Sequence, residues 1–143
     1  MKEKNTEVRF INDIEDLEGL ITEGFFVGWP NPPSSETLKN IIINSQHYIL
    51  AIDNNKLVGF INGISDKTLS AYIPLLEVLP EYKGRGIGSK LVSLMKEELS
   101  RYYMVDISCD DNIVPFYEKH GFKRNNSMYL RNYEKQSGSI SKQ

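Results

Sequence analysis

The sequence predicts an α/β fold in which one mixed sheet is covered by helices. Segments with strand-like alternation or continuous apolar runs follow segments with helical spacing, in the order β-α-α-β-β-β-α-β-α-β. The chain has 143 residues, of which 40% are hydrophobic and 25% charged, enough for one substantial core. We expect a single domain over residues 1–135, followed by a disordered tail, 136–143, because QSGSISKQ is polar.

The first half of the chain is expected to form a strand, two helices and a hairpin. Three prolines after the first helix exclude regular structure there, and Asn54 with Asn55 indicates the hairpin turn. The expected elements are a strand at 8–13, a helix at 14–25 capped by Asp13, a helix from Ser34 or Ser35 through Ile42, and strands at 47–53 and 57–65.

The second half is expected to add three strands and two helices. The segment 69–79 is apolar on both faces, which is typical of a central strand, and Pro74 predicts a bulge or a splay within it. The other expected elements are a helix at 87–99, a strand at 102–109, a helix at 112–121 stopped by Gly121, and a final strand at 128–133.

Composition excludes several classes of function. A net charge of −2 gives no basic footprint for a nucleic acid. Cys109 is the single cysteine, and we expect it to be a core or rim thiol, with no disulfide and no metal site. No apolar run approaches the ~20 residues that span a membrane, and MKEKNTEVRF lacks the apolar stretch of a signal peptide, so we expect a cytoplasmic protein.

The most informative stretch is LEVLPEYKGRGIGSKLV, residues 76–92, which carries glycines at 84, 86 and 88. It joins a predicted strand to a predicted helix, whose free N–H groups and dipole suit an anion such as a phosphate. Lys83, Arg85 and Lys90 add positive charge. A tight turn with packing glycines is the alternative. The dinucleotide fingerprint fails because Ser89 replaces its third glycine, and no P-loop register fits.

This stretch resembles the pyrophosphate-binding signature R/Q-x-x-G-x-G/A of the GNAT superfamily of acyl-CoA N-acyltransferases, with Lys83 where the family usually has Arg or Gln. PFYEKHGF, about thirty residues later, and the element order strengthen the resemblance. It implies a single-domain GNAT fold with a mixed sheet of about six to seven strands, flanking helices, and splayed central strands 69–79 and 102–109. It also implies acetyl-CoA as co-substrate, and an exposed sheet edge that can pair in a homodimer.

The resemblance also implies where coenzyme A binds. The backbone of residues 76–78 would pair with the pantetheine amides, and the amides of residues 84–89 would hold the pyrophosphate. Asp110 stands where the family commonly has Asn, and Asn112 follows two places on. The expected binding residues are Leu76, Glu77, Val78, Lys83, Gly84, Arg85, Gly86, Ile87, Gly88, Ser89, Asp110, Asn112, Phe116 and Tyr117.

Two residues are candidates for the chemistry. Tyr117 stands in a place similar to that of the family's general acid, although an aromatic core residue is the alternative. Glu77 would become a general base if burial raised its pKa; it could instead face water, and a water-mediated base or Asp106 would then serve. The backbone N–H of Val78 could stabilise the oxyanion.

The acceptor is less defined by the sequence. Phe25, Phe26 and Trp29 lie where the family usually shapes the acceptor pocket, or they anchor an irregular loop. The predicted function is direct transfer of an acetyl group from acetyl-CoA to a primary amine of a small molecule or protein. A non-catalytic acyl-CoA sensor and an unrelated nucleotide-phosphate-binding domain are the alternatives. His47 is expected to be a surface or capping residue.

Overall fold

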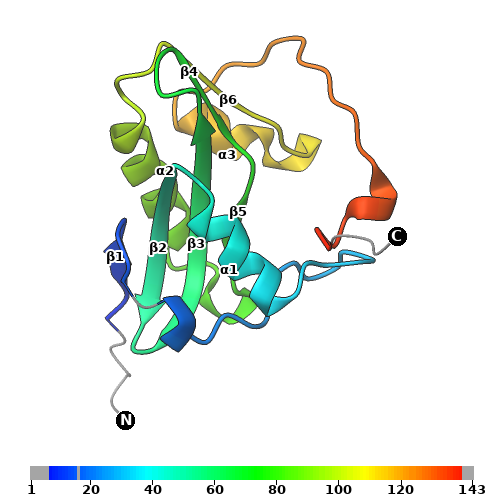
Figure 1. Ribbon diagram of the computed structural model, residues 1–143. Coiled ribbons are helices and arrows are strands. Elements are labelled where there is room, and N and C mark those ends of the chain that lie inside the picture. The colour runs from blue at the N-terminus through cyan, green and yellow to red at the C-terminus, as the bar shows by residue number, and fades with distance from the viewer. Residues whose placement is uncertain (1–6, 16, 140–143) are drawn as a thin grey trace.

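The computed structural model describes residues 7–15 and 17–139 and contains a six-stranded mixed sheet, as predicted. The strand order is β1-β2-β3-β4-β6, and β5 also pairs with β3 (Figure 1). The strands are β1 (Arg9–Ile11), β2 (His47–Asp53), β3 (Lys56–Ser65), β4 (Ser70–Ile73), β5 (Leu76–Val78) and β6 (Met104–Ile107). The helices are α1 (Ser35–Ile43), α2 (Ile87–Glu98) and α3 (Val114–Lys119), with short 3-10 helices η1 (Leu17–Gly19), η2 (Pro80–Tyr82), η3 (Asp111–Ile113) and η4 (Tyr133–Lys135).

The β2–β3 hairpin forms the centre of the sheet, and helices cover both of its faces (Figure 1). On one face, Leu91 and Met95 of α2 are fully buried against the sheet. On the other face, α1 packs Leu38 and Ile42 against the buried side chain of Phe60. The α1 helix begins where the sequence predicts, because Ser34 Oγ accepts the Thr37 N–H (3.0 Å) as an N-cap.

The predicted strand 69–79 is interrupted at Pro74, as expected, and becomes β4 and β5. β4 runs parallel to β6 up to the pair Ile73–Ile107, whereas β5 pairs only with β3. Asn62 of β3 holds the junction: its Oδ1 accepts the Leu75 N–H (3.1 Å) and its N–H donates to Leu75 O (3.3 Å). The sheet therefore opens between β5 and β6.

The helix predicted over 14–25 is wrong. The described part of this segment contains only η1, and its remainder is irregular, with Gly24 at φ +99°. Its hydrogen bonds go instead to the hairpin, where the Ile21 N–H donates to Asn55 O (3.0 Å) and Ile21 O accepts the Leu57 N–H (2.9 Å). Leu17 and Leu20 are still buried, along an irregular path rather than a helix, whereas Ile21 is about half exposed.

The strand predicted over 128–133 is also wrong. After α3 the chain runs away from the sheet, and no strand of the described residues pairs with this segment (Figure 1). Met128 and Leu130 are largely exposed. The chain ends its course beside the loop before α1, where Asn31 N–H donates to Gln136 Oε1 (2.7 Å). Gln136 belongs to the predicted tail 136–143, of which residues 140–143 lie outside the described residues.

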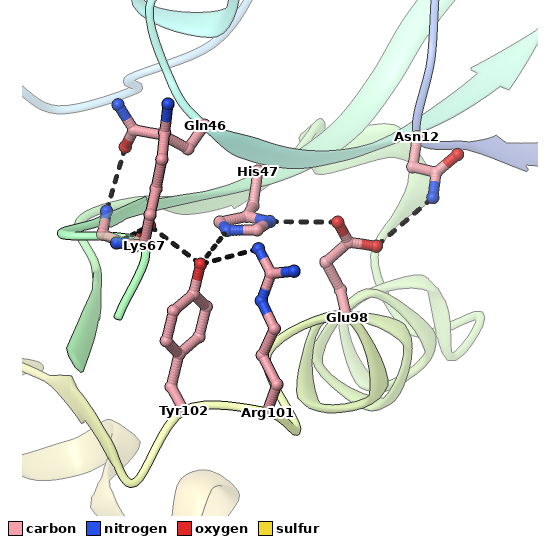
Figure 2. Close-up of polar contacts among 8 residues, drawn as sticks. Asn12, Gln46, His47, Lys67, Glu98, Arg101 and Tyr102 are labelled. Carbon is pink, nitrogen blue, oxygen red and sulfur yellow. Dashed lines mark hydrogen bonds and ion pairs between the residues drawn. The ribbon is translucent and has the colours of Figure 1, made fainter. Parts of the chain in front are cut away.

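His47 is buried, which contradicts its expected place at the surface (Figure 2). Its Nδ1 lies 3.0 Å from Glu98 Oε2, and its Nε2 lies 3.0 Å from the Tyr102 hydroxyl. The same hydroxyl accepts a hydrogen bond from Arg101 Nη2 (2.9 Å) and lies 3.1 Å from Ser65 Oγ. This network ties the start of β2 and the end of β3 to the end of α2, away from the opening of the sheet.

Candidate active site

A cavity of about 1070 Å³ lies where β5 and β6 diverge. It brings together residues from β5, the glycine-rich turn, the start of α2, the loop after β6, and α3. All of the residues predicted to bind coenzyme A except Arg85 line it, namely Leu76, Glu77, Val78, Lys83, Gly84, Gly86, Ile87, Gly88, Ser89, Asp110, Asn112, Phe116 and Tyr117. A volume of this size holds a large ligand.

The glycine-rich turn presents free backbone N–H groups to this cavity. Gly84 (φ +80°) and Gly86 (φ +82°) adopt the left-handed conformation that only glycine tolerates easily. Gly86 is the N-cap of α2 and supplies no side-chain cap. Within the described residues, no hydrogen-bond acceptor serves the N–H groups of residues 87–89. An uncapped helix start of this kind suits an anion.

The cations near this turn take different positions. Lys83 lines the cavity. Arg85 instead turns away: its guanidinium lies 4.6 Å from the centre of the Tyr82 ring and donates to Glu81 O (3.1 Å). The Tyr82 hydroxyl in turn donates to Asp53 Oδ2 (2.5 Å). Arg85 therefore stabilises the shape of the turn, while its backbone stays within the segment predicted to bind phosphate.

Tyr117 is buried and lines the same cavity. Its ring packs against Phe116 and Phe122, with ring centres 4.9 Å and 5.6 Å away. No group in the described part of the chain forms a hydrogen bond with its hydroxyl, and no fully enclosed polar side-chain atom there lacks a partner, so the hydroxyl keeps contact with the cavity. Burial, followed by the nearby Cys109, raises the pKa of Tyr117 to about 12.

Glu77 lies on the opposite face of β5 from Leu76 and Val78, because side chains alternate along a strand. Its half-buried carboxylate accepts the Phe26 N–H through Oε1 (3.1 Å). Desolvation raises the pKa of Glu77, and the Phe26 hydrogen bond and Lys83 oppose this shift. Glu77 thus faces neither bulk water nor the α2 core, but the loop that precedes α1.

The other candidates differ in whether they reach the cavity. Trp29 lines it, whereas Phe25 and Phe26 pack in the core around Phe60 and anchor the loop. Asp106 lies on the exposed face of β6 and lines a separate groove of about 360 Å³. The structure therefore does not bring Asp106 to the site. Cys109 lines the main cavity, but desolvation and the neighbouring Asp110 raise the pKa of its thiol.

Among the lining residues that sequence reasoning did not assign to the site, three come from one distant segment of the chain, namely Tyr129, Arg131 and Tyr133. They alternate in the segment MYLRNY, so they share one face of an extended chain. The same alternation predicted a strand there. The alternation correctly predicted that these three side chains share one face, but this face lines the cavity instead of belonging to a strand of the sheet.

Two other kinds of feature are absent from the part of the chain that the structure describes. No group of three or more His, Cys, Asp or Glu residues is placed to hold a metal ion. No helix there is long and apolar enough to cross a membrane.

The open sheet and the glycine-rich start of α2 agree with the GNAT fold that the sequence resemblance implies, and the comparison with known families gives the same family. The acetyltransferase (GNAT) domain matches residues 26–134, so the chain belongs to this family. It is similar to a solved structure of a candidate acetyltransferase from Deinococcus radiodurans R1, with 42% identity, a TM-score of 0.89, and coverage of 98% of this chain and 99% of that chain.

Curated plant proteins are also similar. GCN5-related N-acetyltransferase 2, chloroplastic, of Arabidopsis thaliana is 30% identical over 78% of this chain and 50% of its own length. Histone acetyltransferase TAP1 of Glycine max is 31% identical over 78% of this chain and 52% of its own length. The chain therefore spans about half the length of these relatives.

Proposed function

We propose that this protein transfers an acetyl group from acetyl-CoA directly to a primary amine of a small molecule or protein. The observation that carries the proposal is one cavity that joins the uncapped start of α2 to Glu77 and Tyr117. Free N–H groups that suit an anion and two titratable side chains therefore border one cavity, which supports the proposal.

The residues present fit coenzyme A. The free N–H groups at residues 87–89, with Lys83 beside them, match the charge and the acceptor oxygens of a pyrophosphate. The edge of β5 that faces away from β3 has no strand partner within the described sheet, so its backbone groups can pair with the amides of a pantetheine arm. Bound acetyl-CoA supplies the acetyl group as a thioester.

Glu77 is the group that removes the proton from the incoming amine. An amine reacts only when neutral, and a lysine-like amine has a pKa of ~10.4. The raised pKa makes the Glu77 carboxylate a stronger base than an exposed glutamate. Its hydrogen bond from Phe26 uses Oε1, which leaves Oε2 as the proton acceptor.

Tyr117 acts at the opposite end of the transfer, on the departing sulfur. A hydroxyl with a pKa of about 12 is protonated throughout the physiological range. An ordinary thiol has a pKa of ~8.5, so complete proton transfer from Tyr117 to a thiolate would be uphill by roughly 3.5 pKa units, or ~5 kcal/mol. Tyr117 therefore stabilises the developing negative charge by donating a hydrogen bond, and solvent completes the protonation.

Direct transfer is supported by the state of Cys109. A covalent route through the enzyme would need a thiolate, and desolvation together with Asp110 raises the pKa of this thiol. No imidazole forms a hydrogen bond with Cys109 among the described residues.

The first experiment measures thermal stabilisation by acetyl-CoA, CoA and NADH. A ligand at 100 times its Kd adds ~2.7 kcal/mol to the free energy of unfolding, which for a chain of this length raises Tm by roughly 5–11 °C. We expect this shift for acetyl-CoA and CoA and none for NADH. An equal shift with NADH would indicate a general nucleotide-binding domain and would refute the proposal.

The second experiment measures release of CoA thiol with a panel of amines that includes amino acids, amino sugars, polyamines and peptides with free N-termini. We expect release that depends on one class of amine. Binding of acetyl-CoA without release from any amine would favour the non-catalytic sensor and would contradict the transferase.

A further inference from the structure

The cavity contains one positively charged side chain that the proposed function does not use. Arg131 belongs to residues 123–136, here called the C-terminal arm, which leaves α3 and runs to the loop before α1 (Figure 1). Tyr129 and Tyr133 flank it at alternate positions, and all three line the cavity.

The arm contacts the same loop that hydrogen-bonds the Glu77 carboxylate. Asn31 N–H donates to Gln136 Oε1 (2.7 Å) and so fixes the arm to the loop before α1. The same loop holds Trp29, whose ring centre lies 4.8 Å from that of Phe26. Phe26 N–H in turn donates to Glu77. Arg131 and Glu77 thus line one cavity, and the loop before α1 contacts both the arm and the Glu77 carboxylate.

The Arg131 guanidinium is oriented but has no counter-charge. It lies 4.5 Å from the centre of the Tyr129 ring, a cation–π contact that restricts its position. Within residues 7–15 and 17–139, no carboxylate lies within 4.0 Å of it. A guanidinium binds a carboxylate or a phosphate through two parallel hydrogen bonds, which a lysine cannot reproduce.

We propose that the acceptor amine carries an anionic group, a carboxylate or a phosphate, and that Arg131 binds it. The inference rests on the proposed function. A molecule with both an ammonium and an anion matches the two charges: its amine approaches Glu77 while its anion pairs with Arg131. A polyamine carries no anionic group for Arg131 to bind.

The test compares acceptors in matched pairs that differ only in the anionic group. The carboxylate pairs are tyrosine with tyramine and tryptophan with tryptamine, and the phosphate pair is O-phosphoethanolamine with ethanolamine. The measurement is kcat/KM for CoA release by the full chain with acetyl-CoA. We expect the anionic member of at least one pair to react roughly 10- to 100-fold faster, and the faster pair identifies the group.

The variant Arg131→Gln should reduce this preference to about one. Lys135→Gln is the matched control, because it removes a positive charge from the same arm at a residue that does not line the cavity. It should keep the preference. Two results would overturn the assignment of Arg131 while acetyl transfer itself stands. The first is an equal or faster reaction of the members that lack the anionic group, and the second is a preference that survives in Arg131→Gln. No CoA release from any amine would overturn both.

Discussion

Two tyrosines are equally buried in this protein, each about 6% exposed, yet their hydroxyl groups differ completely in their surroundings. The Tyr102 hydroxyl contacts His47, Ser65 and Arg101 (Figure 2). The Tyr117 hydroxyl has no hydrogen-bond partner in the described chain and faces the cavity. Replacing each by phenylalanine removes one oxygen atom, so the pair separates the stability of the fold from the chemistry.

Tyr117→Phe should lose activity without losing stability. The hydroxyl that it removes satisfies no protein group, so we expect Tm to change by less than ~2 °C. A hydrogen bond to a charged group contributes ~1.5–3 kcal/mol, so the loss of this donor at the departing sulfur should lower kcat by roughly 10- to 150-fold. Affinity for acetyl-CoA, measured by calorimetry, should stay nearly unchanged.

Tyr102→Phe should show the opposite pattern. Removing its hydroxyl leaves the buried His47 Nε2 without its partner, and we expect Tm to fall by roughly 3–9 °C. Assayed well below this lowered Tm, the variant should keep its kcat. Thermal unfolding and steady-state CoA release measure both quantities on the same preparations. An unaltered kcat in Tyr117→Phe, with Tm also unaltered, would remove this hydroxyl from the mechanism.

Three further predictions concern the general base, the glycine-rich turn and the loop before β4. Glu77→Gln keeps an acceptor for the Phe26 N–H but should lower kcat/KM by roughly 10²–10⁴-fold. It should also abolish the acidic limb of the pH profile of kcat/KM, which in the native protein lies above pH 4.5. An acidic limb that persists in the variant would belong to another group. Gly86→Ala forces a residue with a side chain to φ +82° and should lower the free energy of unfolding by ~1–2 kcal/mol. Gly88→Ala is its control: the new Cβ would lie 3.9 Å from its nearest neighbours, so the variant should not be destabilised. Asp66 accepts three backbone N–H groups, which lower its pKa to about 2. Asp66→Asn should therefore destabilise the folded protein above pH 3.8, and its difference in stability from the native protein should vanish as the pH falls through 2. Equal acid unfolding curves for the two proteins would contradict this.

Local sequence signals predicted the elements whose determinants are local. The cap at Ser34, the hairpin turn at Asn54, the interruption at Pro74 and the glycine-rich start of α2 each depend on residues within a few positions. Most of the residues predicted to bind coenzyme A line one cavity for the same reason, since β5, the turn and the first turn of α2 are consecutive. Arg85 was the exception, because its neighbours Tyr82 and Glu81 hold it away from the cavity.

Distant contacts decided the elements that the sequence did not predict. Residues 14–25 carry helical spacing, but Ile21 pairs with Asn55 and Leu57, which lie more than thirty positions along the chain. Residues 128–133 alternate as a strand does, but a strand needs a neighbouring strand, and none lies beside this segment. His47 became buried because Glu98 and Tyr102 offer partners to both of its ring nitrogens. No short stretch of sequence contains these partners.

The opening of the sheet is fixed by hydrogen bonds within the chain. Pro74 cannot donate a ladder hydrogen bond, and at this point the buried Asn62 donates to Leu75 O and accepts the Leu75 N–H through its side chain. Asn62 Nδ2 also donates to Ser45 Oγ (3.0 Å), which in turn donates to Ile41 O (2.7 Å) of α1. Because the buried Asn62 forms all of these hydrogen bonds, it restricts the movement of β5 toward β6. The cavity therefore does not depend on a ligand to separate the strands, and the same asparagine links the residue before β5 to α1.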